Sequence, residues 1–181
     1  MKAEINKNQL AETNLMLRGV KTNAPKIISR SINKTISKGR TLAAKKINKQ
    51  TALKSKYIKS KLKDQKANFK NLKGRLFADK RGLLMINFVT GLDENGDFLV
   101  KIKSRGKSKV LTNAFLTTIN AGGKKVDAIA TRHPRTDKFK VLHGPSVSQI
   151  FADVRDEVDS ELVEYYAVVT EKQIAAVLRG F

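Results

Sequence analysis

The sequence predicts an α+β protein with basic N-terminal helices, a central antiparallel β-sheet, and one long amphipathic C-terminal helix or two. Apolar residues recur at helical spacing over residues 26–49 and again after Pro145, whereas short apolar runs bounded by turn residues fill the middle. We therefore expect one compact domain with an arm: a basic helical arm over residues 1–70, a β-rich core over 71–144, and a C-terminal helical segment over 145–181, packed on that core.

Glycine and proline residues set the predicted boundaries of the first helices. Residues 8–19 favour a short helix, which Gly19 and the segment ending at Pro25 interrupt. Because proline suits the first turn of a helix, a second helix is expected over residues 26–49. Its apolar stripe consists of Ile28, Ile32, Ile36, Gly39, Ala43 and Ile47. Thr51 is then expected to cap a further helix that extends to about Leu62.

The middle of the chain is expected to be built from strands. The runs 83–89 and 98–103 flank an Asn95-Gly96 turn, which predicts a β-hairpin. The further predicted strands are residues 75–79, 109–111, 114–119, 126–131 and 139–142. Basic residues occupy every second position from Lys101 to Lys109, so an unbroken strand would project them to one face. Gly106 offers the alternative of a turn.

The C-terminal segment regains helical spacing after Gly144-Pro145, which ends the preceding strand. Ser146 or Ser148 is expected to cap the helix. The apolar stripe consists of Val147, Ile150, Phe151, Val154, Val158, Leu162, Tyr165 and Val169. Thr170 and Gln173 have the spacing of a capping box, so both one helix and two helices fit the sequence.

Composition restricts the function. The formal net charge is +21 with a pI near 10.3, and such a chain needs polyanions, acidic partners or spacing within an assembly to offset its self-repulsion. The absence of cysteine removes disulfides, thiolate zinc sites and cysteine nucleophiles. Without a long apolar run or a signal-like start, the chain is expected to be soluble and intracellular when made, with no membrane association.

The charge is polarised along the chain. Residues 21–75 carry eighteen lysines and arginines and one acid, whereas residues 150–181 carry seven acids and three basic residues. The candidate DNA-facing residues are Lys26, Arg30, Lys34, Lys38, Lys45, Lys49, Lys101, Lys103, Arg105, Lys107 and Lys109. Few aromatics are present and lysine outnumbers arginine, which argues against base-specific contacts. An acidic protein partner and plain solvation are the alternatives for the basic helix.

Residues for catalysis are scarce. His133 and His143 are isolated from other ligand types, and the acids at residues 93–97 are typical of a solvated turn. The acids of residues 153–161 fit a solvated helix face better than the metal site of a nuclease. We therefore assign no catalytic, metal-binding or cofactor-binding residue and expect a protein that is not an enzyme.

Three segments carry a resemblance to a known family. They are Ser31-Ile32-Asn33-Lys34-Thr35, Val110-Leu111-Thr112-Asn113-Ala114-Phe115, and Gly144-Pro145-Ser146-Val147-Ser148-Gln149-Ile150-Phe151. Over about residues 25–165 the chain resembles the minor tail protein Z family of tailed bacteriophages, in which glycine often occupies the position of Asn113. Phe115 is expected to be a core residue.

The resemblance implies a virion protein of the phage neck or tail, made in the host bacterial cytoplasm. It implies tail completion at the head-proximal end by a ring, hexameric by analogy, next to the tail tube, tail terminator and head–tail connector proteins and around the DNA passage. The acids expected to meet neighbouring copies are Asp153, Asp156, Glu157, Glu161 and Glu164. The alternative function is a free nucleic-acid-binding protein of ribosomal or nucleoid-associated type.

Overall fold

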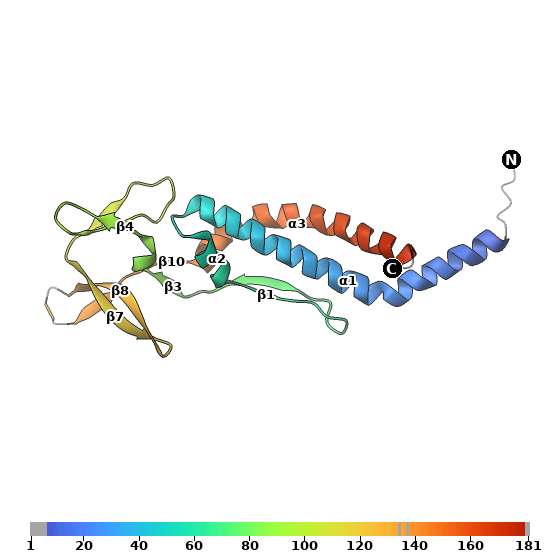
Figure 1. Cartoon of the computed structure of the whole chain (residues 1–181), viewed down its shortest axis with the longest axis horizontal. Helices are drawn as coiled ribbons and strands as arrows, with labels where there is room; N and C mark the ends of the chain where they lie inside the picture. Colours follow the sequence, from blue (N-terminus) through green and yellow to red (C-terminus); the bar gives the residue numbers. More distant parts are fainter. Residues whose placement is uncertain (1–6, 134, 137, 180–181) are drawn as a thin grey trace. The chain divides into compact units, whose positions relative to one another are not determined.

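The α+β class is confirmed in a computed structural model, which describes residues 7–133, 135–136 and 138–179, with side chains from residue 14 onward (Figure 1). The helices are α1 (Lys7–Gln50), α2 (Ser55–Lys61), the 3-10 helix η1 (Met85–Phe88) and α3 (Val147–Leu178). The strands are β1 (Leu62–Gln65), β2 (Arg75–Ala78), β3 (Gly82–Leu84), β4 (Val89–Leu92), β5 (Phe98–Val100), β6 (Lys109–Leu111), β7 (Ala114–Ala121), β8 (Lys124–Arg132), β9 (Phe139–Val141) and β10 (His143–Ser146).

Two compact units share these elements. Unit 1 holds α1 up to Arg40, residues 64–76 and α3 from Glu157 onward, and unit 2 holds residues 41–63 and 77–156. Each unit combines segments that are in contact but separate in sequence. The arm, core and C-terminal segment expected from the sequence are instead consecutive stretches of the chain. That division along the chain stays a prediction.

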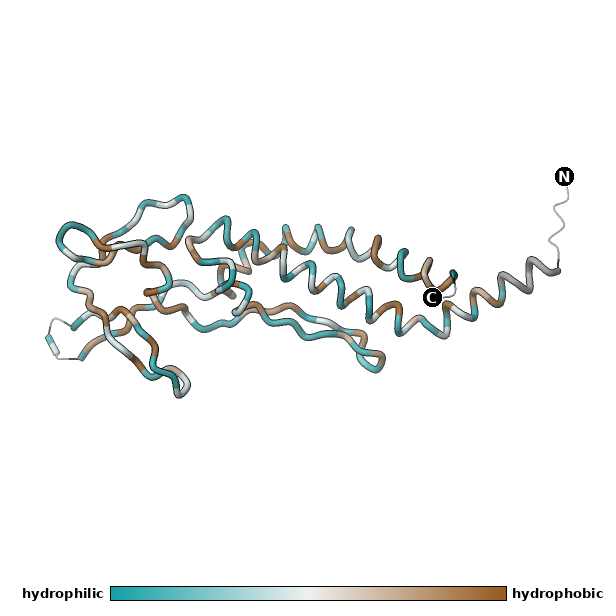
Figure 2. The backbone as a smooth tube through the Cα atoms, in the orientation of Figure 1, coloured by the Kyte–Doolittle hydropathy of each residue, from teal (hydrophilic) through white to brown (hydrophobic). Residues whose placement is uncertain are grey.

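Helix α1 is continuous, so the predicted break before residue 26 is wrong. Pro25 lies inside the helix, where it removes only one backbone hydrogen bond while the residues on both sides continue the spiral. In the preceding turn, Asn23 Nδ2 donates a hydrogen bond to Gly19 O at 3.0 Å. The predicted apolar stripe is confirmed from Ile36 onward, where Ile36, Ala43 and Ile47 are buried, whereas Ile28 and Ile32 are half-buried. Figure 2 shows the alternation of apolar and polar residues along both long helices.

The predicted helix from Thr51 to Leu62 is shortened to α2. Thr51 does not cap it, because its Oγ1 donates back to Ile47 O at 2.9 Å and its backbone forms an isolated bridge with Lys103. Lys54 precedes the helix instead, without a side-chain capping bond.

The strand pattern is confirmed in outline and corrected in one place. The β3–β10, β4–β5–β6 and β7–β8–β9 ladders are antiparallel. Within the run 83–89 the chain forms β3, η1 and the first residue of β4, so the Asn95-Gly96 hairpin joins β4 to β5. For residues 101–109 the predicted alternative of a turn at Gly106 is confirmed, because Gly106 N–H donates to Lys103 O at 3.0 Å, and no unbroken strand forms there.

Two positions quoted for the family resemblance have clear local roles. Asn113 has φ of 58°, in the left-handed region that glycine and asparagine tolerate best, which gives a physical reason for glycine at this position in the family. Phe115 is half-buried rather than a core residue; its ring lies edge-on to Phe139, with centroids 6.2 Å apart, and Arg132 lies 5.7 Å from its centroid.

Helix α3 is one helix, and Ser146 caps it. Gln149 N–H donates to Ser146 Oγ at 3.1 Å, and Ser146 N–H donates to Gln149 Oε1 at 2.8 Å, so the cap is reciprocal. Of the two alternatives, the single helix is confirmed: Thr170 does not cap a second one, because its Oγ1 donates to Tyr166 O at 2.8 Å inside the continuous helix.

Candidate basic interface

In unit 1, α1 presents a row of exposed cations. Lys26, Arg30, Lys34 and Lys38 follow one another at four-residue spacing, and all four are exposed. Lys38 Nζ also lies 5.7 Å from the centroid of the Tyr165 ring on α3, a cation–π contact. Like charges at this spacing repel by about 0.2–0.5 kcal/mol per pair, so an anionic partner would stabilise this face.

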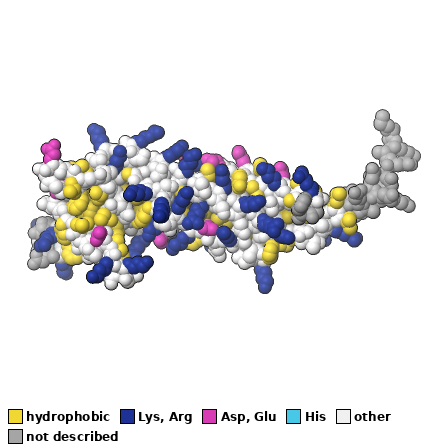
Figure 3. All heavy atoms as spheres, in the orientation of Figure 1, with side chains coloured by type: hydrophobic (Ala, Val, Ile, Leu, Met, Phe, Trp, Pro, Cys, Tyr) yellow, Lys and Arg dark blue, Asp and Glu magenta, His cyan; other side chains and the backbone are white. Residues whose placement is uncertain are grey.

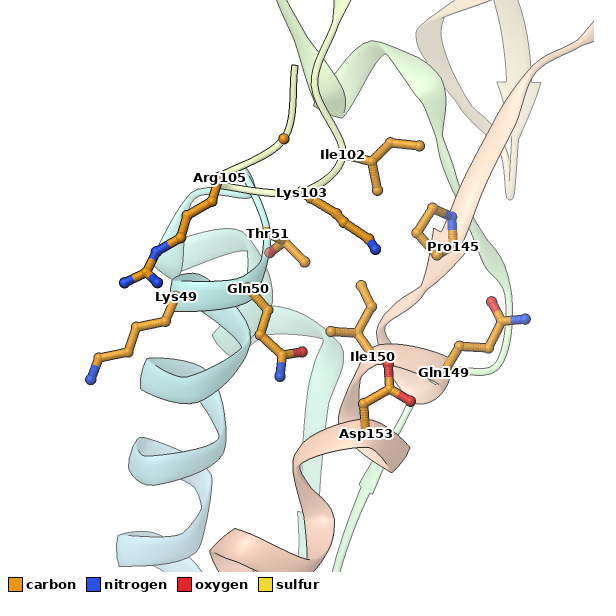
Figure 4. Close-up of a pocket in the computed structure, with 11 residues that line it drawn as sticks. Lys49, Gln50, Thr51, Ile102, Lys103, Arg105, Pro145, Gln149, Ile150 and Asp153 are labelled. Carbon is orange, nitrogen blue, oxygen red and sulfur yellow. The ribbon is translucent and has the colours of Figure 1, made fainter. Parts of the chain in front are cut away.

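In unit 2, the predicted basic residues of two distant segments line one pocket of about 790 Å³ (Figure 4). Lys49 lies in the last turn of α1, and Lys103 and Arg105 come from the loop between β5 and β6. Backbone hydrogen bonds join these segments: Ala52 N–H donates to Ile102 O at 3.1 Å, and Ser104 N–H donates to Gln50 O at 2.9 Å. The three cations are therefore positioned by backbone pairing.

The opposite side of this pocket is formed by β10 and the start of α3. Pro145 of β10 and Ile150 of α3 provide an apolar surface, and Asp153 of α3 adds one carboxylate to the lining (Figure 4). The pocket thus keeps an excess of positive charge beside apolar carbon. Such a surface suits phosphate oxygens or acidic side chains, and its lysines act as mobile point charges rather than as base-reading forks.

The other predicted basic residues lie outside this pocket. Lys45 is exposed one turn before Lys49, and Lys107 and Lys109 are exposed beyond the turn closed by Gly106, whereas Lys101 is half-buried. Figure 3 shows Lys and Arg side chains over helices and strands alike, with few acids among them.

The predicted acidic residues are all exposed and all lie on α3. Asp153 and Asp156 belong to unit 2, and Glu157, Glu161 and Glu164 belong to unit 1. On the same helix, Val154 and Val158 are each 1% exposed and belong to the core. One helix therefore combines a core-packing stripe with a negatively charged outer surface.

In residues 7–133, 135–136 and 138–179, no group of three or more His, Cys, Asp and Glu side chains is arranged to hold a metal ion. A second pocket, of about 470 Å³, is lined by Tyr57, Asp79 and His143 among others, and burial raises the pKa of the Tyr57 hydroxyl. His143 Nδ1 lies 3.1 Å from Val141 O, a local backbone contact. None of the described helices is long and apolar enough to cross a membrane.

The family comparison decides the class of protein. A family model described as prophage minor tail protein Z matches residues 10–181. The chain belongs to the prophage minor tail protein Z family. Comparison with curated proteins and with solved structures gave no significant match.

Membership of the tail protein Z family confirms the resemblance identified from the sequence and makes this chain a structural component of a phage tail. Within this tail protein, sequence analysis missed one exposed surface, the loop between β1 and β2. It carries Phe69, which is 65% exposed, among three lysines. An aromatic residue inside an Asn- and Lys-rich turn was the available signal.

Proposed function

We propose that this tail protein completes the head-proximal end of the tail as a closed ring, hexameric by analogy, around the DNA passage. In this role it contacts the tail tube, tail terminator and head–tail connector proteins and touches double-stranded DNA without reading its sequence. The role is structural and needs no catalysis or cofactor. The observation that carries the proposal is the separation of charge between exposed basic surfaces and the acidic outer surface of α3.

The basic surfaces support a diffuse DNA contact. A net charge of +21, carried largely by lysines, favours phosphate over base edges. A passage must attract DNA weakly enough for the genome to leave. Exposed lysines on α1 and around the unit 2 pocket satisfy that requirement better than a bidentate arginine clamp.

The acidic side of α3 supports contacts between copies. Identical chains with one basic and one acidic surface can associate head to tail, and a head-to-tail contact closes into a ring when its rotation fits. Large apolar side chains that are more than half exposed point the same way, since an assembly would cover them. They include Leu116 at 56%, Phe139 at 53% and Val163 at 71%.

A mass measurement tests the proposal. The purified chain should form discrete ring-sized oligomers in native mass spectrometry and closed rings in negative-stain electron microscopy. Association should weaken with added salt, because charge complementarity contributes to it. A chain that stays monomeric at every concentration and is missing from tailed particles would overturn the proposal.

The free nucleic-acid binder is the second candidate, and the same net charge favours it. It requires that the monomer bind DNA or RNA tightly with a steep salt dependence. Retention of monomer on duplex DNA near physiological salt, without oligomers, would support this alternative. Loss of DNA binding near physiological salt together with ring formation supports the tail role.

A further inference from the structure

The loop joining β1 to β2, residues 66–73, is here called the hairpin tip. It exposes two apolar side chains, Phe69 at 65% and Leu72 at 36%. Lys66, Lys70 and Lys73 surround them, all are exposed, and the tip contains no acid. The tip therefore combines apolar surface with a charge of +3.

The conformation of the tip is fixed by hydrogen bonds. The Asn33 side chain on α1 forms two hydrogen bonds with the backbone of Ala67: its Nδ2 donates to Ala67 O at 2.9 Å, and Ala67 N–H donates to its Oδ1 at 2.8 Å. Within the loop, Asn68 Oδ1 accepts from Lys70 N–H at 3.0 Å and from Asn71 N–H at 2.6 Å. A pre-ordered loop loses little entropy when a partner binds it.

Helix α3 carries a surface of opposite character in the same unit. Its outer strip is formed by Ser160, Val163, Glu164, Ala167, Val168 and Glu171, which are all exposed. Val163 is 71% exposed and Val168 is 46% exposed, and helical spacing puts Glu164 and Glu171 between them. The strip contains no lysine or arginine.

We propose that the hairpin tip of one copy docks on the outer strip of α3 in a second copy. Phe69 and Leu72 would cover Val163 and Val168 while the tip lysines meet Glu164 and Glu171. The proposal rests on the self-association proposed above and names the surfaces that carry it. Both halves are complementary in charge and both leave apolar carbon in water when the chain is alone.

The position of the two surfaces in unit 1 favours contact between copies. The tip is attached to α1 through Asn33. Helix α3 packs against α1 at Gly39, which faces Leu162. Asn33 and Gly39 lie on different faces of α1. Figure 1 shows this part of α1 running between the β1–β2 hairpin and α3. A contact that joins different surfaces of identical chains is head to tail, and it closes into a ring when its rotation fits.

Duplex DNA is a poorer partner for the hairpin tip than the outer strip of α3 is. A phosphate backbone would attract the lysines but leave Phe69 and Leu72 in contact with water. The outer strip of α3 satisfies both the charged and the apolar groups of the tip. A second copy of this chain is therefore the occupant that the exposed side chains favour.

Disulfide trapping tests the contact, since the chain has no cysteine of its own. Purified Phe69→Cys and Val163→Cys chains, one with a size tag, are mixed and oxidised with a mild oxidant. A disulfide-linked heterodimer should form several-fold more than in the matched control, Leu116→Cys mixed with Val163→Cys, because Leu116 is similarly exposed at 56%. A heterodimer yield equal to that of the control would overturn the proposal.

Charge reversal separates this contact from the ring itself. Lys70→Glu with Lys73→Glu should prevent trapping and self-association, and so should Glu164→Lys with Glu171→Lys, whereas a mixture of the two variants should restore both. Circular dichroism melting should match that of the parent chain, because all four positions are exposed. Parent rings that persist after reversal of the tip would refute the contact and leave the tail-ring role standing. If the parent chain does not self-associate and its cysteine variants give no disulfide-linked heterodimer, both the contact and the tail-ring role are refuted. If charge reversal of the tip lowers only the affinity for DNA, the tip binds DNA and the proposed contact is refuted.

Discussion

Phe88→Ala is expected to lower the free energy of unfolding by about 3–5 kcal/mol, the usual cost of deleting a buried aromatic ring. Phe88 is 1% exposed in unit 2. Its ring lies so close to Gly144 that a Cβ on that glycine would be 2.6 Å from Phe88 Cε2. The ring therefore fills the space beside β10, and its removal leaves a cavity that the glycine backbone cannot fill.

Urea unfolding of dilute protein, where copies do not associate, measures this loss. The matched control is Phe69→Ala, which removes the same ring from a position that is 65% exposed and should cost less than about 1 kcal/mol. Similar losses for the two variants would show that Phe88 is not a core residue.

Neutralising the unit 2 pocket is expected to weaken duplex DNA binding about tenfold or more at low salt. The variant carries Lys49→Gln, Lys103→Gln and Arg105→Gln, which removes the three cations that line the pocket. Each lost phosphate contact should also reduce the slope of log affinity against log salt by about 0.9. Fluorescence anisotropy with a short duplex at several salt concentrations measures both quantities.

The control for this variant removes the same charge elsewhere. Lys124→Gln, Lys125→Gln and Lys140→Gln lie on exposed positions of β8 and β9, outside the pocket, and leave the same net charge. They should lower affinity less and leave the slope nearly unchanged. Equal effects of the two triple variants would mean that DNA senses only net charge and that the pocket has no special part.

Helical elements were predictable from sequence because their evidence is local. The stripe containing Ile36, Ala43 and Ile47 is buried as its spacing required, and the Ser146 cap lies where the Gly-Pro-Ser segment predicted it. Pro25 misled the prediction because local rules place proline at helix starts, whereas a long helix can tolerate one missing hydrogen bond.

Features that depend on distant contacts were not predictable. The alternating basic residues of 101–109 left a strand and a turn at Gly106 open, but nothing in the sequence indicated that Lys103 pairs with Thr51. That pairing brings Lys49 beside Lys103 and creates the pocket. The hairpin tip likewise depends on Asn33, which binds a backbone residue 34 positions away. The hydrophobic and turn patterns within one segment carry no information on which distant segments come into contact.

We propose that this tail protein Z family member forms a ring around the DNA passage at the head-proximal end of the tail. Cryo-electron microscopy of tailed particles from the phage that encodes this chain is the most direct test. We expect a closed ring at the head-proximal end, with α1 or the unit 2 pocket facing the lumen and the hairpin tip of each copy against α3 of the next. Particles that lack the chain, or that carry it at the distal end of the tail, would contradict the proposal.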